Sequence, residues 1–482
     1  MQEHEKWEKP WKTAWPRRAT ASEQEQEEQR RRDAPTVERA RAARALDPRP
    51  NVLFLLTDQQ TAAALSCAGN PYVNTPNMDR LAQRGVRFAK SYCTDPVCTP
   101  SRGSLLTGRM PHELGLAFIS ESPEPTIPNF GQVFRQAGYE TAWCGKWHLP
   151  QSDVLDYDGI PGFDNIAHPG ESQSLHGHGD ATDSLHANDA AFLLRWEFHK
   201  IGLPWLCGVS LTNPHDICHW TTVPPRRHLN IAHYPPLPAN FAVPPDEPDV
   251  VKAIRGNLGP ATNQEIPRTT NWDDAQWRAY VEVYYHLTEQ VDRSIGVVLD
   301  ALELGGWLES TLVILTSDHG DGCGAHRWAA KNCFYEEPMT VPMLVSFPGR
   351  LPEGAVDEGH LVSGLDVMPT MCDYAGVDTP TVCGRSLRAI IEEPHAAWRD
   401  CVVAELNVGS YEKLLCGRMV RSASYKYCVY STGRKREQLF DMSEDPGEMN
   451  DLSGRADFAD VVRRHRDMLR EWMRLTGDSF SL

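Results

Sequence analysis

Carboxylate, amide and imidazole side chains follow two apolar runs of the sequence. Asp58 and Gln59 end the run NVLFLLTDQQ, and Asp318 and His319 come directly after the run TLVILTS. The carboxyl ends of buried strands meet at a cleft in an open α/β sheet, so these side chains are expected to converge. Oxygen and imidazole donors together would bind a divalent cation. A single acid after a strand more often caps a turn, but its repetition after two strands favours a metal site.

Basic side chains lie beside further apolar runs. Lys146 and His148 follow one run and, being two residues apart, project to the same side of an extended segment. His215 follows another run and Lys331 precedes a third. Taken singly, each is more typical of a solvated lysine or a capped turn. Together with Arg102 they would neutralise a tetrahedral oxyanion such as sulfate or phosphate, and the histidines could act as general acid and base.

Cys98 opens the segment CTPSRGSLLTGR, which is typical of a helix start. The residue types alone leave four readings: a thiolate nucleophile, a metal ligand, a small buried residue, or the precursor of another group. A helix start favours an anion, which suits a thiolate. No CxxC or His/Cys cluster of zinc-binding spacing accompanies the cysteine, so a zinc site has no support.

The elements that must position these residues alternate along the chain. Short aliphatic runs are typical of strands buried on both faces of a parallel sheet. They are NVLFLLTD from residue 51 and the runs at 140–146, 205–211, 311–317 and 341–347. Strands alternating with helices predict an α/β fold with a mostly parallel central sheet and helices on both faces.

Two helices are predicted with clear ends. The first has Thr75 as its N-cap, Pro76 as its first residue and Gly85 after its end. The second covers residues 273–304, where apolar side chains recur at three- and four-residue steps before Gly305 and Gly306. This stripe comprises Tyr280, Tyr284, Leu287, Val291, Ile295, Val298 and Leu302.

The pattern changes near both ends of the chain. Residues 1–48 are highly charged and predict a solvated extension, whereas residues 49–395 predict the catalytic domain. Residues 396–482 predict a smaller α+β subdomain with short antiparallel strands and an amphipathic closing helix.

Charge and composition limit the partners. The 482 residues include 48 Lys and Arg against 65 Asp and Glu, a net charge of −17, which argues against nucleic acid or an anionic membrane as partner. The sequence has no apolar run long enough to span a bilayer, and its first residues lack the apolar core of a secretory signal. With 13 cysteines, the chain is expected in a reducing cytoplasm.

CTPSRGSLLTGR resembles the signature of the type I, formylglycine-dependent sulfatases of the alkaline phosphatase superfamily, Cys-x-Pro-Ser-Arg followed by Thr-Gly. Other stretches resemble the same family in the expected order, over about residues 50–455. They are NVLFLLTDQQ, NTPNMDRLAQRGVRFAKSY, GYETAWCGKWHL, TLVILTSDHGD and LFDMSEDPGEMNDL. The resemblance implies a core of alkaline-phosphatase type, with a smaller C-terminal subdomain.

The resemblance also implies a cofactor and a modification. A dedicated maturation enzyme would oxidise Cys98 to formylglycine. Asp58, Gln59, Asp318 and His319, with residue 98, would bind the metal, which in this family is usually calcium. Manganese and magnesium stay open, because the family often has Asn where this chain has His319 and imidazole is an unusual calcium ligand.

The implied mechanism assigns each remaining residue a role. One hydroxyl of the hydrated residue-98 aldehyde attacks sulfur, while Lys146, Lys331 and Arg102 neutralise the sulfate oxygens. His215 protonates the leaving alcohol and His148 takes the proton from the second hydroxyl, so that sulfate is released. Arg102 also holds the residue-98 loop.

The expected substrate is the sulfate ester of a sugar or another small organic molecule, and the chain is compatible with a homo-oligomer. Two alternatives remain: a phosphonate monoester or phosphodiester hydrolase of the same superfamily, and a non-catalytic binder of sulfated glycans. Residues 168–186, with four histidines, are expected to form a loop at the pocket rim, where His219 would line the leaving-group pocket.

Overall fold

The computed structural model describes residues 47–116, 124, 126–149, 160–165, 179–220, 234–257, 269, 271–410 and 413–482. Almost all of the extension predicted over residues 1–48 lies outside these ranges, so the structure does not test that prediction. Among the helices within these ranges, none has the length and apolar character needed to cross a bilayer.

A central sheet of eight strands has the order β5-β4-β6-β1-β7-β8-β2-β9. Its strands in chain order are β1 (Asn51–Asp58), β2 (Gly85–Phe88), β4 (Glu140–Gly145), β5 (Asp164–Asn165), β6 (Trp205–Pro214), β7 (Thr311–Ser317), β8 (Met343–Ser346) and β9 (Ala355–Asp357). Every neighbouring pair is parallel except the two made by β8, which runs antiparallel to both β7 and β2. The predicted mostly parallel sheet is therefore confirmed. The run at 341–347 forms β8, the one strand whose direction is reversed.

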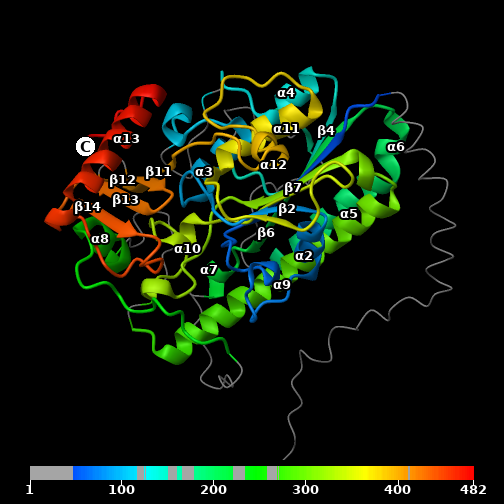
Figure 1. Cartoon of the computed structure of the whole chain (residues 1–482). Coiled ribbons are helices and arrows are strands. Elements are labelled where there is room, and N and C mark those ends of the chain that lie inside the picture. The colour runs from blue at the N-terminus through cyan, green and yellow to red at the C-terminus, as the bar shows by residue number, and fades with distance from the viewer. Residues whose placement is uncertain are drawn as a thin grey trace, which may run out of the picture.

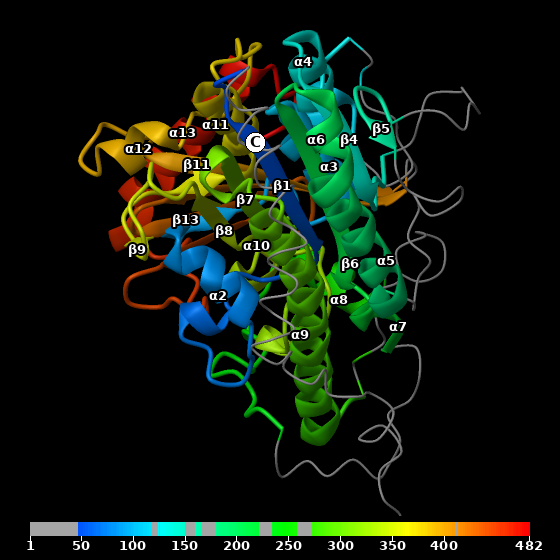
Figure 2. The same ribbon diagram turned by 90° about the vertical axis from the view of Figure 1, so that its right-hand side faces the viewer.

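Helices cover both faces of this sheet, as Figure 2 shows for α9 and α5 on one side. Along β1, Val52, Phe54 and Leu56 belong to one buried cluster, and Leu53 and Leu55 belong to the other. Successive side chains of a strand point to opposite faces, and a strand apolar at every position can bury both. The apolar run that begins at Asn51 is thus accounted for by its place in the middle of the sheet.

The helices divide between the two faces. On the Val52 face pack α3 (Cys98–Thr107), α4 (Phe130–Gln136), α11 (Val367–Ala375) and α12 (Arg388–Glu392). On the Leu53 face pack α2 (Pro76–Gln83), α5 (Gly179–Phe192), the π-helical turn Leu193–Glu197, α6 (Phe198–Ile201) and α9 (Asp274–Leu304). Three short helices lie beyond the sheet, namely α7 (Ile217–Trp220), α8 (Asp249–Asn257) and α10 (Glu336–Met339).

The two predicted helix boundaries hold with one difference in chemistry. Helix α9 begins after Asp273, whose side chain accepts a hydrogen bond from the N–H of Gln276, and Gly305 ends it. Thr75 stands at the N-cap of α2, but its side chain makes no capping bond and instead contacts the hydroxyl of Ser66. Gly85 is already the first residue of β2.

A second sheet follows in the C-terminal part of the chain, to the left in Figure 1. Its antiparallel strands are β11 (Cys401–Ser410), β12 (Lys413–Ser422), β13 (Tyr425–Tyr430) and β14 (Glu437–Asp441), and they are followed by α13 (Ala459–Thr476). In addition, β3 (Ser91–Tyr92) and β10 (Val362–Ser363) form a small pair.

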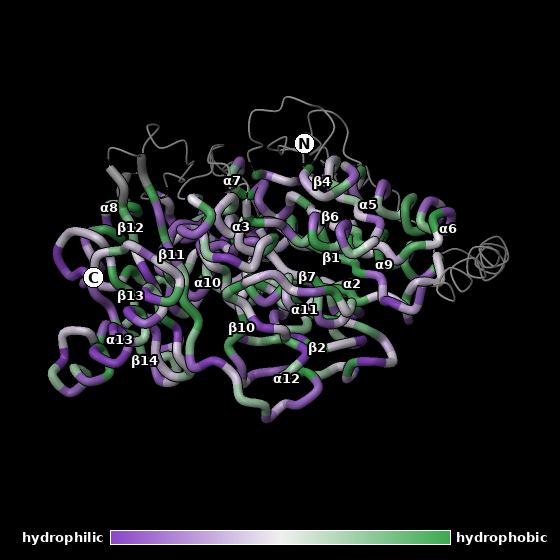
Figure 3. Tube along the Cα trace, turned by 90° about the horizontal axis from the view of Figure 1, so that it is seen from above, coloured by the Kyte–Doolittle hydropathy of each residue, from purple (hydrophilic) through white to green (hydrophobic). Residues whose placement is uncertain are grey.

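The C-terminal sheet is buried on both faces. Val462 and Leu469 of α13 pack on one face. On the other face, Met419 and Cys428 pack with Phe334, which lies three residues after Lys331. In the view from above, apolar segments lie in the middle of both sheets (Figure 3). The C-terminal sheet therefore packs against the segment that carries Lys331.

Candidate active site

Two carboxylates mark the carboxyl ends of neighbouring strands. β1 and β7 are parallel and in register up to the pair Thr57–Ser317, so Asp58 and Asp318 emerge side by side. The Nε of Arg102 and one of its Nη atoms connect them, as described below. This is the convergence that the two strand-end motifs predict.

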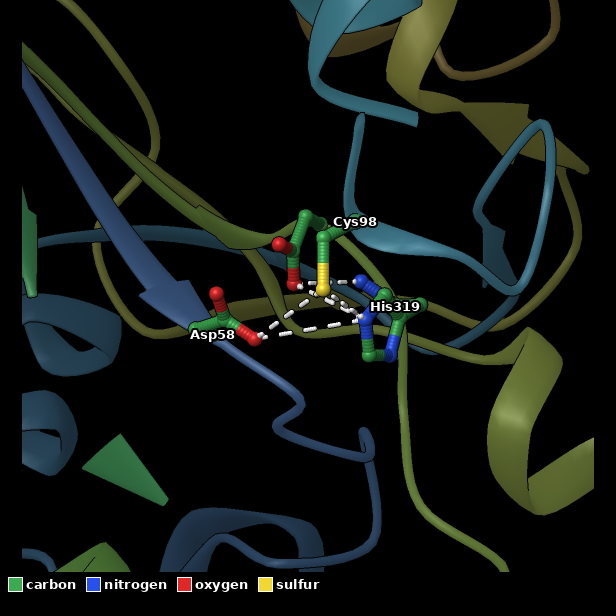
Figure 4. A group of neighbouring side chains, drawn as sticks. Asp58, Cys98 and His319 are labelled. Atoms are coloured by element: carbon green, nitrogen blue, oxygen red, sulfur yellow. Dashed lines mark hydrogen bonds and ion pairs between the residues drawn. The ribbon is translucent and has the colours of Figure 1, made fainter. Parts of the chain in front are cut away.

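Cys98 and His319 complete a compact group with these acids, shown in Figure 4. Potential ligand atoms of Asp58, Cys98, Asp318 and His319 all lie within 4.8 Å of one another. Cys98 Sγ is 3.2 Å from His319 Nε2 and 3.8 Å from Asp58 Oδ1. All four side chains are 0% exposed, so their charges are removed from water and depend on each other for balance.

Two lysines reach the same group from other loops. Lys331 Nζ lies 2.6 Å from Cys98 Sγ, and Lys146 Nζ lies 2.5 Å from Asp58 Oδ2. Lys146 directly follows β4, whereas Lys331 lies in the segment between β7 and α10. The structure thus brings both lysines singled out from the sequence against the acids and the cysteine.

Arg102 lies beneath the group, one turn into α3. Its Nε is 2.8 Å from Asp318 Oδ2 and one Nη is 3.0 Å from Asp58 Oδ2. Its other Nη donates to the Lys146 carbonyl oxygen at 3.0 Å and to the Ser210 hydroxyl at 2.9 Å. With its nitrogens engaged in this way, Arg102 is suited to hold the acids and the start of α3 in place, the second of the two roles expected for it.

The cations control the protonation of the group. Burial and the Asp58 carboxylate raise the pKa of the Cys98 thiol, but Lys331, His319 and Lys146 together outweigh them and lower it below its usual value. Burial also raises the pKa of Asp58, and Lys146, His215, Arg102 and Lys331 lower it well below the usual range. The site therefore favours the deprotonated, negatively charged forms of Cys98 and Asp58.

The two histidines expected to move protons are neutral in this environment. Burial, followed by the positive charge of Lys146, holds the pKa of His148 and that of His215 well below the usual range. The His148 carbonyl oxygen accepts a hydrogen bond from the Thr99 hydroxyl at 2.9 Å, which ties this histidine to the start of α3. Within the described ranges, His148 Nδ1 is buried without a hydrogen-bond partner.

Gln59 has a different orientation from the other four predicted metal ligands. Its side-chain nitrogen donates to Asp321 Oδ2 at 2.8 Å and lies 3.4 Å from Cys218 Sγ. Its backbone N–H donates to Asp318 Oδ1 at 3.0 Å. Asp321, in the motif SDHGD, and Cys218 were not singled out by the sequence. Asp321 could have been recognised from the sequence as the second acidic residue of the SDHGD motif.

The donor set fits a divalent cation. Two carboxylates supply the oxygen ligands that hard cations prefer, and their burial requires positive charge. His319 Nδ1 lies 2.9 Å from the Gly320 carbonyl oxygen, to which it can donate, leaving Nε2 directed at Cys98 and the acids. An imidazole oriented in this way by a carbonyl is the usual arrangement of a metal-binding histidine.

The histidine-rich segment is only partly a loop. Residues 168–178 lie outside the described ranges, but Gly179 to His186 form the first two turns of α5, which corrects the expected loop over 168–186. The correction has a physical basis: Thr182, Asp183 and His186 of this helix are buried, and α5 packs along β6. His219 lies in α7, half-buried and four residues after His215.

Two family models match the chain. The model described as Sulfatase matches residues 50–377, and the model described as N-sulphoglucosamine sulphohydrolase, C-terminal, matches residues 324–474. The chain is 29% identical over 453 residues to the Delta 4,5-hexuronate-2-O-sulfatase of Bacteroides thetaiotaomicron, covering 91% of this chain and 92% of the relative. It is 27% identical to the N-acetylglucosamine-6-O-sulfatase of that organism, covering 89% and 87%.

Solved structures resemble the fold over nearly the whole chain. A 2-O GAG sulfatase superposes with a TM-score of 0.78 at 28% identity, covering 90% of this chain and 93% of that one. A phosphonate monoester hydrolase of Agrobacterium radiobacter superposes with a TM-score of 0.72 at 22% identity, covering 89% and 96%. At that identity the second similarity shows the fold alone.

Proposed function

The chain belongs to the sulfatase family of sulfuric ester hydrolases, in the alkaline phosphatase superfamily, and from this premise we propose that it removes sulfate from a sulfated sugar. The proposed nucleophile is formylglycine made from Cys98, and a divalent cation is the proposed cofactor. Two relatives named above are described as acting on hexuronate 2-O-sulfate and N-acetylglucosamine 6-O-sulfate, which supports a sugar as the leaving group.

The observation that carries this proposal is the environment of residue 98. Its side chain lies between Lys331, at 2.6 Å, and His319, at 3.2 Å, with the Asp58 carboxylate next to it. An ordinary hydroxyl could form a sulfate ester here, and a thiol could form an S-sulfonate, but neither product could be broken by elimination. The hydrate of an aldehyde supplies two hydroxyl groups, one to attack sulfur and one whose deprotonation drives release.

Lys331 and Lys146 are the proposed anion-binding groups. Each ammonium already lies within 2.6 Å of an acid or of the Cys98 sulfur, so both charges are in position before substrate arrives. Preorganised cations in a site that excludes water stabilise the charge that develops on the sulfate oxygens. Arg102 keeps Asp58 and Asp318 at a fixed separation.

His148 and His215 are the proposed proton carriers. His148 is neutral and half-buried, which suits a base that removes the proton from the second hydroxyl of residue 98. His215 would protonate the leaving alcohol. It must first take up a proton, which the negative charge of a bound sulfate ester favours because that charge opposes the effect of Lys146.

The proposed cation site consists of Asp58, Asp318, His319 and residue 98. Gln59 would join it only by turning its amide oxygen away from Cys218. A divalent cation there acts as a Lewis acid and lowers the cost of gathering negative charge around the sulfate. Calcium fits the carboxylates. Manganese and magnesium are the alternatives, because imidazole is an unusual calcium ligand.

We also propose that residues 49–395 form the catalytic unit and that residues 396–482 form a subdomain that supports it. The support is the shared buried cluster in which Met419 and Cys428 of the second sheet meet Phe334 and Tyr335, close in sequence to Lys331.

The test begins with peptide mass spectrometry across residues 98–109 on protein made with a formylglycine-generating enzyme. We expect the aldehyde at residue 98, and turnover of sugar sulfates well above turnover of aryl phosphonate monoesters. Faster hydrolysis of the phosphonates would instead make the chain a phosphonate hydrolase. Turnover by a protein whose Cys98 remains a thiol would refute the formylglycine mechanism, and binding without turnover by fully converted protein would indicate a glycan-binding protein.

A further inference from the structure

Two tyrosines of α9 extend from the helix into the loops of the active site. The spacing of Tyr280 and Tyr284 matches an apolar stripe, and both rings are 0% exposed. Their hydroxyl groups, however, each bond two partners, and all of these partners lie in loops at the carboxyl ends of β1 and β7. A buried tyrosine normally finds one partner for its hydroxyl, so two partners on each tyrosine, all in the same region, call for a specific explanation.

Tyr284 fixes the turn that follows Asp58. Its hydroxyl donates to the Gln59 carbonyl oxygen at 2.7 Å and accepts the Thr61 N–H at 2.9 Å. Gln59 has φ of 68°, in the left-handed region that residues with a Cβ seldom adopt. The two hydrogen bonds therefore hold a strained turn at the residue next to a proposed metal ligand.

Tyr280 acts in the same way on the segment before Lys331. Its hydroxyl accepts the Ala330 N–H at 2.9 Å and donates to Asp321 Oδ2 at 2.7 Å. Ala330 has φ of 63°, again in the left-handed region. Asp321 in turn accepts the side-chain N–H of Gln59 at 2.8 Å, which links the two tyrosines into one network.

We propose that Tyr280 and Tyr284 are positioning residues of the active site. One helical turn apart on a rigid helix of 31 residues, they lock the backbone at Gln59 and at Ala330, and through them the positions of Asp58 and Lys331. The proposal rests on the proposed function, since it assigns the tyrosines to the same cation and sulfate sites. Strained backbone held by surrounding contacts is common where groups must be prearranged for function.

The test removes only the hydroxyl groups. Tyr284→Phe should weaken divalent cation binding, and Tyr280→Phe should weaken binding of inorganic sulfate. Each loss should be about five- to tenfold, which corresponds to the free energy of about one of the two buried hydrogen bonds that each change removes. Binding of Mn²⁺ and Ca²⁺ to chelator-treated protein, and of sulfate to the cation-loaded protein, is measured by calorimetry. Tyr285→Phe is the matched control, because Tyr285 is the next residue of α9 and its hydroxyl faces Asn70, away from the turns at Gln59 and Ala330.

A rescue experiment separates positioning from general stability. Glycine adopts the left-handed conformation freely, so Ala330→Gly should recover most of the sulfate affinity in the Tyr280→Phe protein and none of the cation affinity in the Tyr284→Phe protein. Wild-type affinities in both single variants would overturn the proposal, and so would losses equal to those of Tyr285→Phe. If the wild-type protein neither binds sulfate nor cleaves any sulfate ester, it is the proposed function that fails.

Discussion

Replacing Asp183 by asparagine tests the role of His215 from a distance. Asp183 lies on α5, is 1% exposed, and accepts the Thr212 N–H on Oδ1 at 2.5 Å and the Asn213 N–H on Oδ2 at 2.9 Å. These two amides belong to the end of β6, immediately before the turn that presents His215. The carboxylate therefore fixes the backbone from which this histidine projects.

The expected magnitude follows from the hydrogen-bond count. Asparagine retains one acceptor oxygen, so one of the two buried N–H groups would face the amide nitrogen and lose its partner. Above about pH 7, where Asp183 is ionised, a buried hydrogen bond to this charged group contributes about 1.5–3 kcal/mol. At such a pH we expect the loss of that bond to lower the free energy of unfolding by about 2 kcal/mol. A positioned general acid accelerates a reaction by roughly 10²–10⁴-fold, and a displaced His215 would lose part of this acceleration.

The assay compares two leaving groups. A sugar alcohol needs a proton to leave, so kcat for a sugar sulfate should fall by about tenfold or more in Asp183→Asn. Nitrophenolate leaves without one, so kcat for 4-nitrophenyl sulfate should fall by less than about threefold. Asp180→Asn, which changes an exposed carboxylate one turn earlier in α5, is the control and should resemble wild type.

A double-variant cycle decides whether the effect passes through His215. In a His215→Ala background, adding Asp183→Asn should cause little further loss on the sugar sulfate, because the group that it positions is already absent. Equal losses on both leaving groups, or full additivity with His215→Ala, would refute the reasoning.

Three further predictions follow from individual side chains. Burial raises the pKa of Asp183 to about 7, so the folded protein keeps a proton that the unfolded chain releases above its usual value of 3.8. The free energy of unfolding should therefore fall as pH rises between these values. In Asp183→Asn, the free energy of unfolding measured by urea denaturation should depend less steeply on pH. Lys331→Ala should lower kcat/KM for sulfate esters by about 10²–10³-fold, as measured by initial rates, with Lys252→Ala as a surface control. Leu302→Ala, at a fully buried position of α9, should lower the free energy of unfolding by about 2–5 kcal/mol in urea titrations without changing KM, whereas Leu475→Ala, 65% exposed, should change neither.

The sequence was informative where local pattern and a general topological rule act together. Residues 52–56 before Asp58 and residues 312–315 before Asp318 are apolar at every position, which is typical of a strand in the middle of a covered sheet. Parallel neighbours then bring their ends together, so that the meeting of these acids with His319 could be anticipated without any tertiary information.

Side chains whose role depends on long-range packing could not be recognised. Tyr280 and Tyr284 fit an apolar stripe because the aromatic ring dominates the pattern. The hydrogen-bond partners of their hydroxyl groups lie 41 or more residues away in the chain. Asp183 has the same character, since its two partners are 29 and 30 residues away. The reversed direction of β8 was also beyond the pattern, because a strand buried on both faces looks the same whichever way it runs.

The burial of α3 constrains the order of events in which an active protein can form. Cys98 is 0% exposed, Ser101 and Arg102 are 1% exposed, and Arg102 is fastened to acids of two different strands. A maturation enzyme that must grasp this segment has no access to it once the sheet has closed. Under the proposed function, modification and folding therefore compete in time. A chain that folds first keeps its thiol for as long as it stays folded, and the fraction of active molecules reflects the relative rates of the two processes.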